Sequence, residues 1–264
     1  MRPASRSWAT VGVLVLAVTV ALASVTVVLR HRHSESSDPL SPILASAPVG
    51  ETKSMLFLGD SYTIGPTSLP DLGYACLTAS SFGWNCNLGA QAGTGYISGG
   101  PDHRVYPVMG TLGMDSTSLF ERVPRMRALY DADVVVLDAG RNDLSYGQEN
   151  LDNLFVYTLE RVQEAWPNAQ IVVIPPWFIK SVDLYFEGDG ADLSVAASLE
   201  KRLRSDPAFD QVLYINPSTL NWFSGEDVTS LMDKDNIHPN KLGHQVIARK
   251  LAAALTEEGI GTDE

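Results

Sequence analysis

The chain has 264 residues, 45% of them hydrophobic, which suits one large domain or two small ones with an apolar core. Its formal net charge of −12 argues against nucleic acid as a partner, because phosphate recognition depends on basic side chains. We interpret the acidic surplus mainly as a source of solubility.

Residues 10–29 form a run without a charged side chain, preceded by Arg2 and Arg6. About twenty apolar residues are enough to cross a bilayer as a helix. The run is longer than the core of a typical cleaved signal peptide. Residues 1–30 are therefore predicted to be an uncleaved signal anchor, which holds the following domain at the extracytoplasmic face of the cell membrane. Secretion after cleavage and a buried core helix are the alternatives.

The remaining chain divides into a linker, one domain and a tail. Residues 31–52 are rich in Ser, Pro and Ala without periodicity, as in a flexible linker. Residues 53–257 alternate short apolar runs with amphipathic stretches, and residues 258–264 follow as a C-terminal tail. The pattern predicts strands at 55–58, 82–88, 134–137, 170–174 and 212–215, and helices at 71–81, 118–130, 149–166, 193–204 and 241–255. This predicts an α/β domain with a five-stranded, mainly parallel sheet between two layers of helices, but not the order of the strands.

The first strand ends at Gly59-Asp60-Ser61. Gly59 permits a tight turn, and Ser61 falls where a helix would begin. Ligands of open α/β sheets bind at this edge. Ser61 can therefore cap the helix, or it can attack a substrate whose oxyanion is held by the N–H groups of the helix start.

Cys76 and Cys86 are the only cysteines, ten positions apart. Two thiols are too few for the usual structural zinc sites. In an oxidising compartment they would form a disulfide that closes a short loop. A pair of reduced, buried thiols is the alternative.

Two further motifs follow predicted strands. The first motif, residues 87–95, overlaps the start of a glycine-rich segment, 89–113. We expect this segment to be a long surface loop with a functional role. Its spacing fits no phosphate-binding loop, and a plain turn is the alternative. Gly140-Arg141-Asn142-Asp143 follows the third strand, and the Asn142 amide is a suitable oxyanion donor. A helix cap at Asn142 or Asp143 is the alternative.

The last motif, residues 233–240, precedes the final helix and contains Asp235 and His238. A histidine acting as a general base needs a partner that fixes its tautomer, and Asp235 is placed to supply a carboxylate. A metal site formed with Asp233 is less favoured, because no second cluster of ligands accompanies it. A loop with a helix cap is the third interpretation.

Two other ionisable residues have no assigned role. Asp138 directly follows a strand, and if it is buried it needs partners that the sequence does not identify. His244 is expected on the polar side of the last helix.

Taken together, the four motifs resemble those of the SGNH hydrolases, also called GDSL-type lipases and esterases, over residues 55–255. The resemblance implies a flavodoxin-like α/β/α sandwich, in agreement with the strand pattern. Tyr62 replaces the leucine of the GDSL motif, a position that shapes the site rather than reacting. An α/β-hydrolase is less favoured, because Ser61 lacks the second glycine of a nucleophile elbow.

The resemblance also implies roles for individual residues. Ser61 would be the nucleophile, and His238, oriented by Asp235, would move its proton. The oxyanion hole would consist of the Ser61 N–H, the Asn142 side chain and a glycine N–H. Three glycines could supply the last donor: Gly93, which we favour, then Gly89, and Gly95. No metal or cofactor is implied.

We therefore expect a serine esterase that hydrolyses carboxylic esters through an acyl-enzyme intermediate. Its substrate would be a small-molecule, glycan or lipid ester, such as an O-acyl group of the cell envelope. An acyltransferase that uses the same Ser, His and Asp is one alternative. A non-catalytic surface carbohydrate-binding module is the other, and it leaves the four motifs unexplained.

Overall fold

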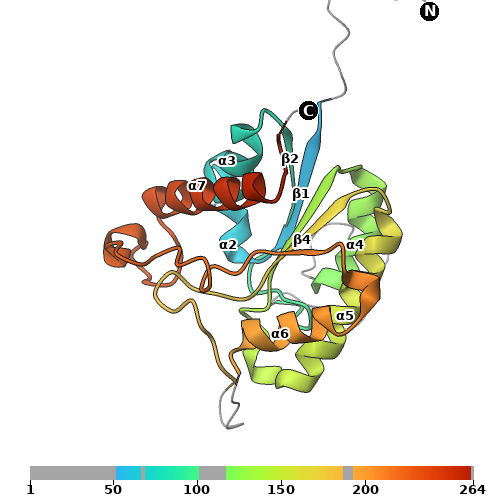
Figure 1. Cartoon of the computed structure of the whole chain (residues 1–264). Helices are drawn as coiled ribbons and strands as arrows, with labels where there is room; N and C mark the ends of the chain where they lie inside the picture. Colours follow the sequence, from blue (N-terminus) through green and yellow to red (C-terminus); the bar gives the residue numbers. More distant parts are fainter. Residues whose placement is uncertain (1–51, 67–68, 101–116, 187–192, 263–264) are drawn as a thin grey trace, which may run out of the picture. The chain divides into compact units, whose positions relative to one another are not determined.

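The computed structural model describes residues 52–66, 69–100, 117–186 and 193–262 (Figure 1). The predicted signal anchor and all but the last residue of the predicted linker lie outside these ranges. Among the helices of the described ranges, none is both long and apolar enough to cross a bilayer.

Five parallel strands form one sheet, as predicted: β1 (Ser54–Gly59), β2 (Asn85–Ala90), β3 (Val134–Asp138), β4 (Gln170–Ile174) and β5 (Leu213–Tyr214). Their order in the sheet is β2-β1-β3-β4-β5, which is the flavodoxin-like order. After β1, the chain adds β2 on one side of that strand and then adds β3 on its other side. In such sheets a ligand binds beyond the carboxyl ends of the two strands where the order reverses, here β1 and β3.

The five predicted helices are present as α3 (Tyr74–Ser81), α4 (Leu119–Leu129), α5 (Gln148–Ala165), α6 (Val195–Arg204) and α7 (Lys241–Glu257). Helices α3 and α7 cover one face of the sheet, and α4, α5 and α6 cover the other (Figure 1). Successive strand residues point to opposite faces. Met55 and Phe57 accordingly pack under α3 and α7, whereas Leu56 and Leu58 pack under the other three helices.

Two predicted boundaries are wrong. The helix expected from residue 71 is interrupted at Gly73, so that a 3₁₀ turn (Pro70–Leu72) precedes α3. The second strand begins at Asn85 and extends to Ala90, because Phe82 and Gly83 form the turn that ends α3. It therefore includes the first two residues of the predicted glycine-rich loop, and residues 101–113 of that loop lie outside the described ranges.

A disulfide joins Cys76 of α3 to Cys86 of β2, the pairing that the sequence suggested. It links an edge strand of the sheet to the helix that covers it.

Candidate active site

Ser61 lies at the turn between β1 and a single helical turn, α2 (Ser61–Ile64). The capping role considered for Ser61 belongs to Asp60, whose Oδ1 accepts the Tyr62 N–H at 2.9 Å. Gly59 is required here by close packing, since a Cβ atom on it would lie 2.0 Å from Thr63 Oγ1. The turn thus leaves the Ser61 hydroxyl uncommitted to capping.

The Ser61 hydroxyl contacts the imidazole of His238, which lies 177 positions later in the sequence. Ser61 Oγ is 2.8 Å from His238 Nε2, and His238 Nδ1 is 2.6 Å from Asp235 Oδ2. In a neutral imidazole one ring nitrogen donates and the other accepts. With Nδ1–H donating to Asp235, Nε2 is available to accept the Ser61 proton.

Asp235 is itself fixed by the backbone that carries His238. Its Oδ1 accepts the N–H groups of Ile237 and His238 at 2.9 and 3.0 Å. The hydrogen bond from the His238 side chain, followed by these two N–H groups, lowers the pKa of Asp235 to about 2. A carboxylate that stays ionised can orient a histidine and stabilise its protonated form.

The sequence predicts three hydrogen-bond donors for an oxyanion hole, on Ser61, Gly93 and Asn142. The Asn142 Nδ2 group donates one hydrogen to Thr94 O at 2.9 Å, which orients the amide and leaves its second hydrogen available. Within the described part of the chain, neither the Ser61 N–H nor the Gly93 N–H donates to a protein acceptor. All three donors are therefore available for an oxyanion hole, and this role stays a prediction.

The three candidate glycines differ in environment. Gly89 lies within β2, and a Cβ atom there would meet Leu58 at 2.6 Å, so packing accounts for it. The Gly95 N–H already donates to Ser98 O at 2.9 Å. Gly93 has a φ of +71° and an uncommitted N–H. The geometry therefore favours Gly93 over the other two.

Asp143 fixes the loop of residues 93–98 next to Asn142. Its completely buried carboxylate accepts N–H groups from Tyr96 at 2.7 Å, Ser98 at 2.8 Å and Ile97 at 3.2 Å. Burial raises the pKa of Asp143, and these three donors oppose the shift. Asp143 therefore organises a loop, a role that the sequence did not indicate.

A buried ion-pair network lies beneath the turn. Arg141 Nη1 is 3.1 Å from Asp60 Oδ2, and its Nη2 is 2.6 Å from Asp138 Oδ1. Arg141 Nε also donates to Trp177 O at 2.7 Å. Burial alone would lower the pKa of Arg141, but the carboxylates of Asp138 and Asp60 reverse the effect and raise it. Arg141 is thus the partner of Asp138 that the sequence left unidentified.

The network continues to the last helix through Tyr74. The Tyr74 hydroxyl donates to Asp138 Oδ2, and the Tyr74 N–H donates to His244 Nδ1 at 3.3 Å. His244 stacks on the Tyr74 ring and is 2% exposed, so its expected position on the polar side of the helix is wrong. Burial lowers the pKa of His244 to about 4, and the residue is neutral near pH 7.

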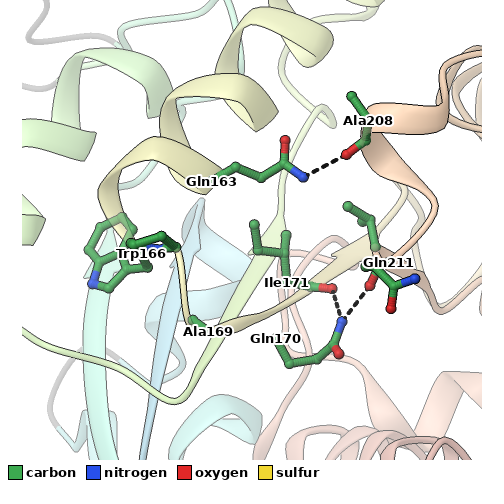
Figure 2. A pocket seen from close by; sticks show the side chains of 9 residues that line it. Gln163, Trp166, Ala169, Gln170, Ile171, Ala208 and Gln211 are labelled. Atoms are coloured by element: carbon green, nitrogen blue, oxygen red, sulfur yellow. Dashed lines mark hydrogen bonds between the residues drawn. The ribbon is translucent and has the colours of Figure 1, made fainter.

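No group of three or more His, Cys, Asp or Glu side chains is arranged to hold a metal ion among the residues the structure describes. A pocket of about 300 Å³ lies at the opposite edge of the sheet, around the first residues of β4, and Gln163, Gln170 and Gln211 line it (Figure 2). None of the predicted site residues contacts this pocket.

A family model described as the GDSL-like lipase/acylhydrolase family matches residues 57–246. A protein named GDSL lipase from Mycobacterium tuberculosis is 27% identical over 208 residues, which cover 77% of this chain and 82% of that protein.

Solved structures of two carbohydrate esterases share the fold. A family two enzyme from Clostridium thermocellum has a TM-score of 0.51 and 20% identity over 78% of this chain, which spans only 64% of the enzyme's length. A family 2 enzyme from Corynascus thermopiles (Myceliophthora fergusii) has a TM-score of 0.55 and 22% identity, covering 82% of this chain and 69% of that one.

A salicylyl-acyltransferase from a tetracycline biosynthetic pathway has a TM-score of 0.53 and 17% identity, covering 80% of this chain and 57% of that one. All three similarities concern the fold.

Proposed function

Because the chain belongs to the GDSL-like lipase/acylhydrolase family of serine hydrolases, we propose that it is an esterase whose nucleophile is Ser61. The observation that carries the proposal is the continuous hydrogen-bonded sequence from Ser61 Oγ through His238 to Asp235, with distances of 2.8 and 2.6 Å. A hydroxyl, an imidazole and a carboxylate in this order convert a weakly nucleophilic serine into an effective one.

In the first half of the reaction, Ser61 Oγ attacks the ester carbonyl carbon while His238 Nε2 takes the hydroxyl proton. The carbonyl oxygen becomes an oxyanion, which the Ser61 N–H, the Gly93 N–H and the Asn142 amide stabilise. The tetrahedral intermediate then collapses. Its bond to the alcohol oxygen breaks, His238 gives its proton to the departing alcohol, and the acyl group remains on Ser61.

In the second half, a water molecule replaces the alcohol. His238 Nε2 takes a proton from the water as its oxygen attacks the acyl carbon, and the same donors stabilise the second oxyanion. Collapse breaks the bond to Ser61 Oγ, which recovers a proton from His238. The carboxylic acid leaves and the free enzyme is restored.

We propose that the esters are O-acyl groups on envelope glycans or lipids. Support comes from the fold shared with two carbohydrate esterases, and acetylated sugars are therefore among the first compounds to test. A chain-length series of nitrophenyl esters, assayed beside acetylated sugars, measures how the enzyme selects the acyl group and the alcohol.

We also propose that the domain works outside the cytoplasm, held by residues 1–30 or released from them. The Cys76–Cys86 disulfide supports this location, because such bonds persist mainly in oxidising compartments. Protease treatment of intact cells, compared with lysed cells, tests it: a domain that is protected until lysis would contradict the proposal.

The main test replaces Ser61 by Ala and measures hydrolysis of a short activated ester and labelling by a fluorophosphonate probe. Ser61→Ala should lose labelling and nearly all turnover, because the nucleophile is gone. Ser230→Ala is the matched control, since its surface hydroxyl donates only to Asp227 O. Wild-type turnover in Ser61→Ala would overturn the proposal, and failure of the wild type to react would favour the carbohydrate-binding module.

Transfer to an alcohol other than water would use the same residues, and the fold shared with an acyltransferase makes this the second candidate function. Only the acceptor differs between the two reactions. Products should therefore be analysed with and without a sugar acceptor: free acid in both cases indicates hydrolysis, and acylated sugar indicates transfer.

A further inference from the structure

Tyr62, which follows the proposed nucleophile directly, contacts the loop that carries His238. Its hydroxyl donates to the carbonyl oxygen of Ile237 at 2.5 Å, across 175 positions of sequence. The centroid of its ring lies 5.8 Å from that of the His238 imidazole. One side chain therefore joins the Ser61 turn to the backbone immediately before His238.

The loop from Asp233 to His238 is otherwise held mainly by itself. The Asp233 N–H donates to His238 O, and the Asp235 carboxylate accepts two N–H groups of the same loop. Among the described residues, only three hydrogen bonds join it to the rest of the domain. Ser61 supplies the first, Tyr62 the second, and the third is an exposed bond of 2.9 Å from Lys180 Nζ to Asn236 Oδ1.

The Tyr62 ring is fixed on its other sides. The Arg141 guanidinium lies 4.4 Å from the ring centroid, and the rings of Trp177 and Phe178 meet it edge-on at 5.5 and 5.6 Å. Tyr62 is 1% exposed, and burial raises its pKa to about 12, so its hydroxyl keeps the proton it donates. The donor is thus held by the Arg141 guanidinium of the ion-pair network and by two aromatic rings.

We propose that Tyr62 is a positioning residue that fixes the distance between His238 and Ser61. The proposal rests on the proposed function of these two residues. Without the hydroxyl, the Ile237 carbonyl is held only by solvent, and His238 samples positions from which it cannot accept the Ser61 proton. Because proton transfer requires a hydrogen bond of correct length, displacement of the imidazole lowers the rate of the chemical step more than it lowers substrate binding.

Tyr62→Phe tests the inference, because it removes one oxygen atom and keeps the ring. We expect kcat to fall about tenfold and KM to stay within about twofold, the effect of losing one well-formed hydrogen bond in the transition state. Tyr214→Phe is the matched control: the Tyr214 hydroxyl donates to Ala196 O at 2.6 Å, away from the site, and its loss should leave kcat within about twofold.

A double-mutant cycle with His238→Ala separates positioning from a general structural effect. If Tyr62 acts through His238, adding Tyr62→Phe to His238→Ala should not change the residual turnover. Rates are counted per folded molecule, at a temperature where circular dichroism shows every variant folded.

The possible results are distinct. An unchanged kcat in Tyr62→Phe, or an equal loss in the presence and absence of His238, overturns the positioning role. Full activity of His238→Ala alone would overturn the proposed function instead.

Discussion

The sharpest prediction concerns the stability that Arg141 gives the domain. Its side chain is 2% exposed, and the two carboxylates that it pairs with, on Asp60 and Asp138, are completely buried. Arg141→Met keeps an unbranched side chain but leaves both acids without their shared cation. Removing one partner of a buried ion pair costs about 3–5 kcal/mol, which is a large part of a typical domain's stability.

The loss of stability in Arg141→Met should depend on pH, and the ion-pair network determines the direction of this dependence. Burial raises the pKa of Asp60, and Arg141 opposes the shift. Without Arg141 the folded-state pKa of Asp60 rises further above its unfolded value. A raised pKa contributes stability that is present at low pH and lost as the pH rises through it. The difference in unfolding free energy between wild type and Arg141→Met should therefore be largest near pH 8 and smaller near pH 5.

Urea unfolding followed by circular dichroism at the two pH values measures both effects. Arg161→Met is the control, because Arg161 pairs with Glu164 on the surface, where both side chains are largely exposed. Its loss should change the unfolding free energy by less than about 1 kcal/mol. A cost for Arg141→Met below about 1 kcal/mol at pH 8, or one that does not decrease toward pH 5, would refute the reasoning.

Three further predictions follow from the site and its surroundings. Asn142→Ala should lower kcat by about 10²–10³, because it removes one proposed oxyanion donor. The control is Asn150→Ala, which should leave kcat unchanged because the exposed Asn150 amide donates to Tyr146 O. A less than threefold decrease of kcat in Asn142→Ala would contradict the role. As the pH is lowered from about 6.5 to 4, the free energy of unfolding should decrease by at most about 3 kcal/mol, because His244 takes up a proton at a higher pH in the unfolded chain than in the folded one. Denaturant titrations of His244→Gln over the same pH range should lack this decrease. Replacing Cys76 and Cys86 together by Ser should cost about 2–3 kcal/mol by releasing a short closed loop. Reductant should then destabilise the wild type and have no effect on the double variant.

The sequence was sufficient to predict the elements of the fold but not their arrangement. Continuous apolar runs marked the strands because both faces of the sheet are covered, and amphipathic stretches marked the helices. The order β2-β1-β3-β4-β5 could not be predicted, since every parallel order produces the same alternation. The start of β2 was misplaced because Phe82 is as apolar as a strand residue, yet it ends α3.

The proposed reacting residues were predictable because each follows the end of a strand or precedes a helix, where side chains reach the open edge of the sheet. Their supports were not. Asp138 and Asp60 become neighbours of Arg141 only once β1 is paired with β3 in register, with Gly59 beside Asp138. His244 was misassigned for a similar reason: it became an interior residue through its contact with Tyr74 of α3, a helix 170 positions away.

The same pairing explains how the proposed nucleophile and the proposed oxyanion donor keep a fixed separation. Ser61 follows Asp60 at the end of β1, and Asn142 follows Arg141 beyond the end of β3. The bond of 3.1 Å from Arg141 to Asp60 therefore joins the two segments one residue away from each proposed functional group. Tyr62, which lies on the guanidinium of Arg141, extends this connection to the loop of His238. Arg141 thus stabilises the fold through the contacts that align all three proposed functional groups, so a variant that loses its charge should lose turnover even at temperatures where it remains folded.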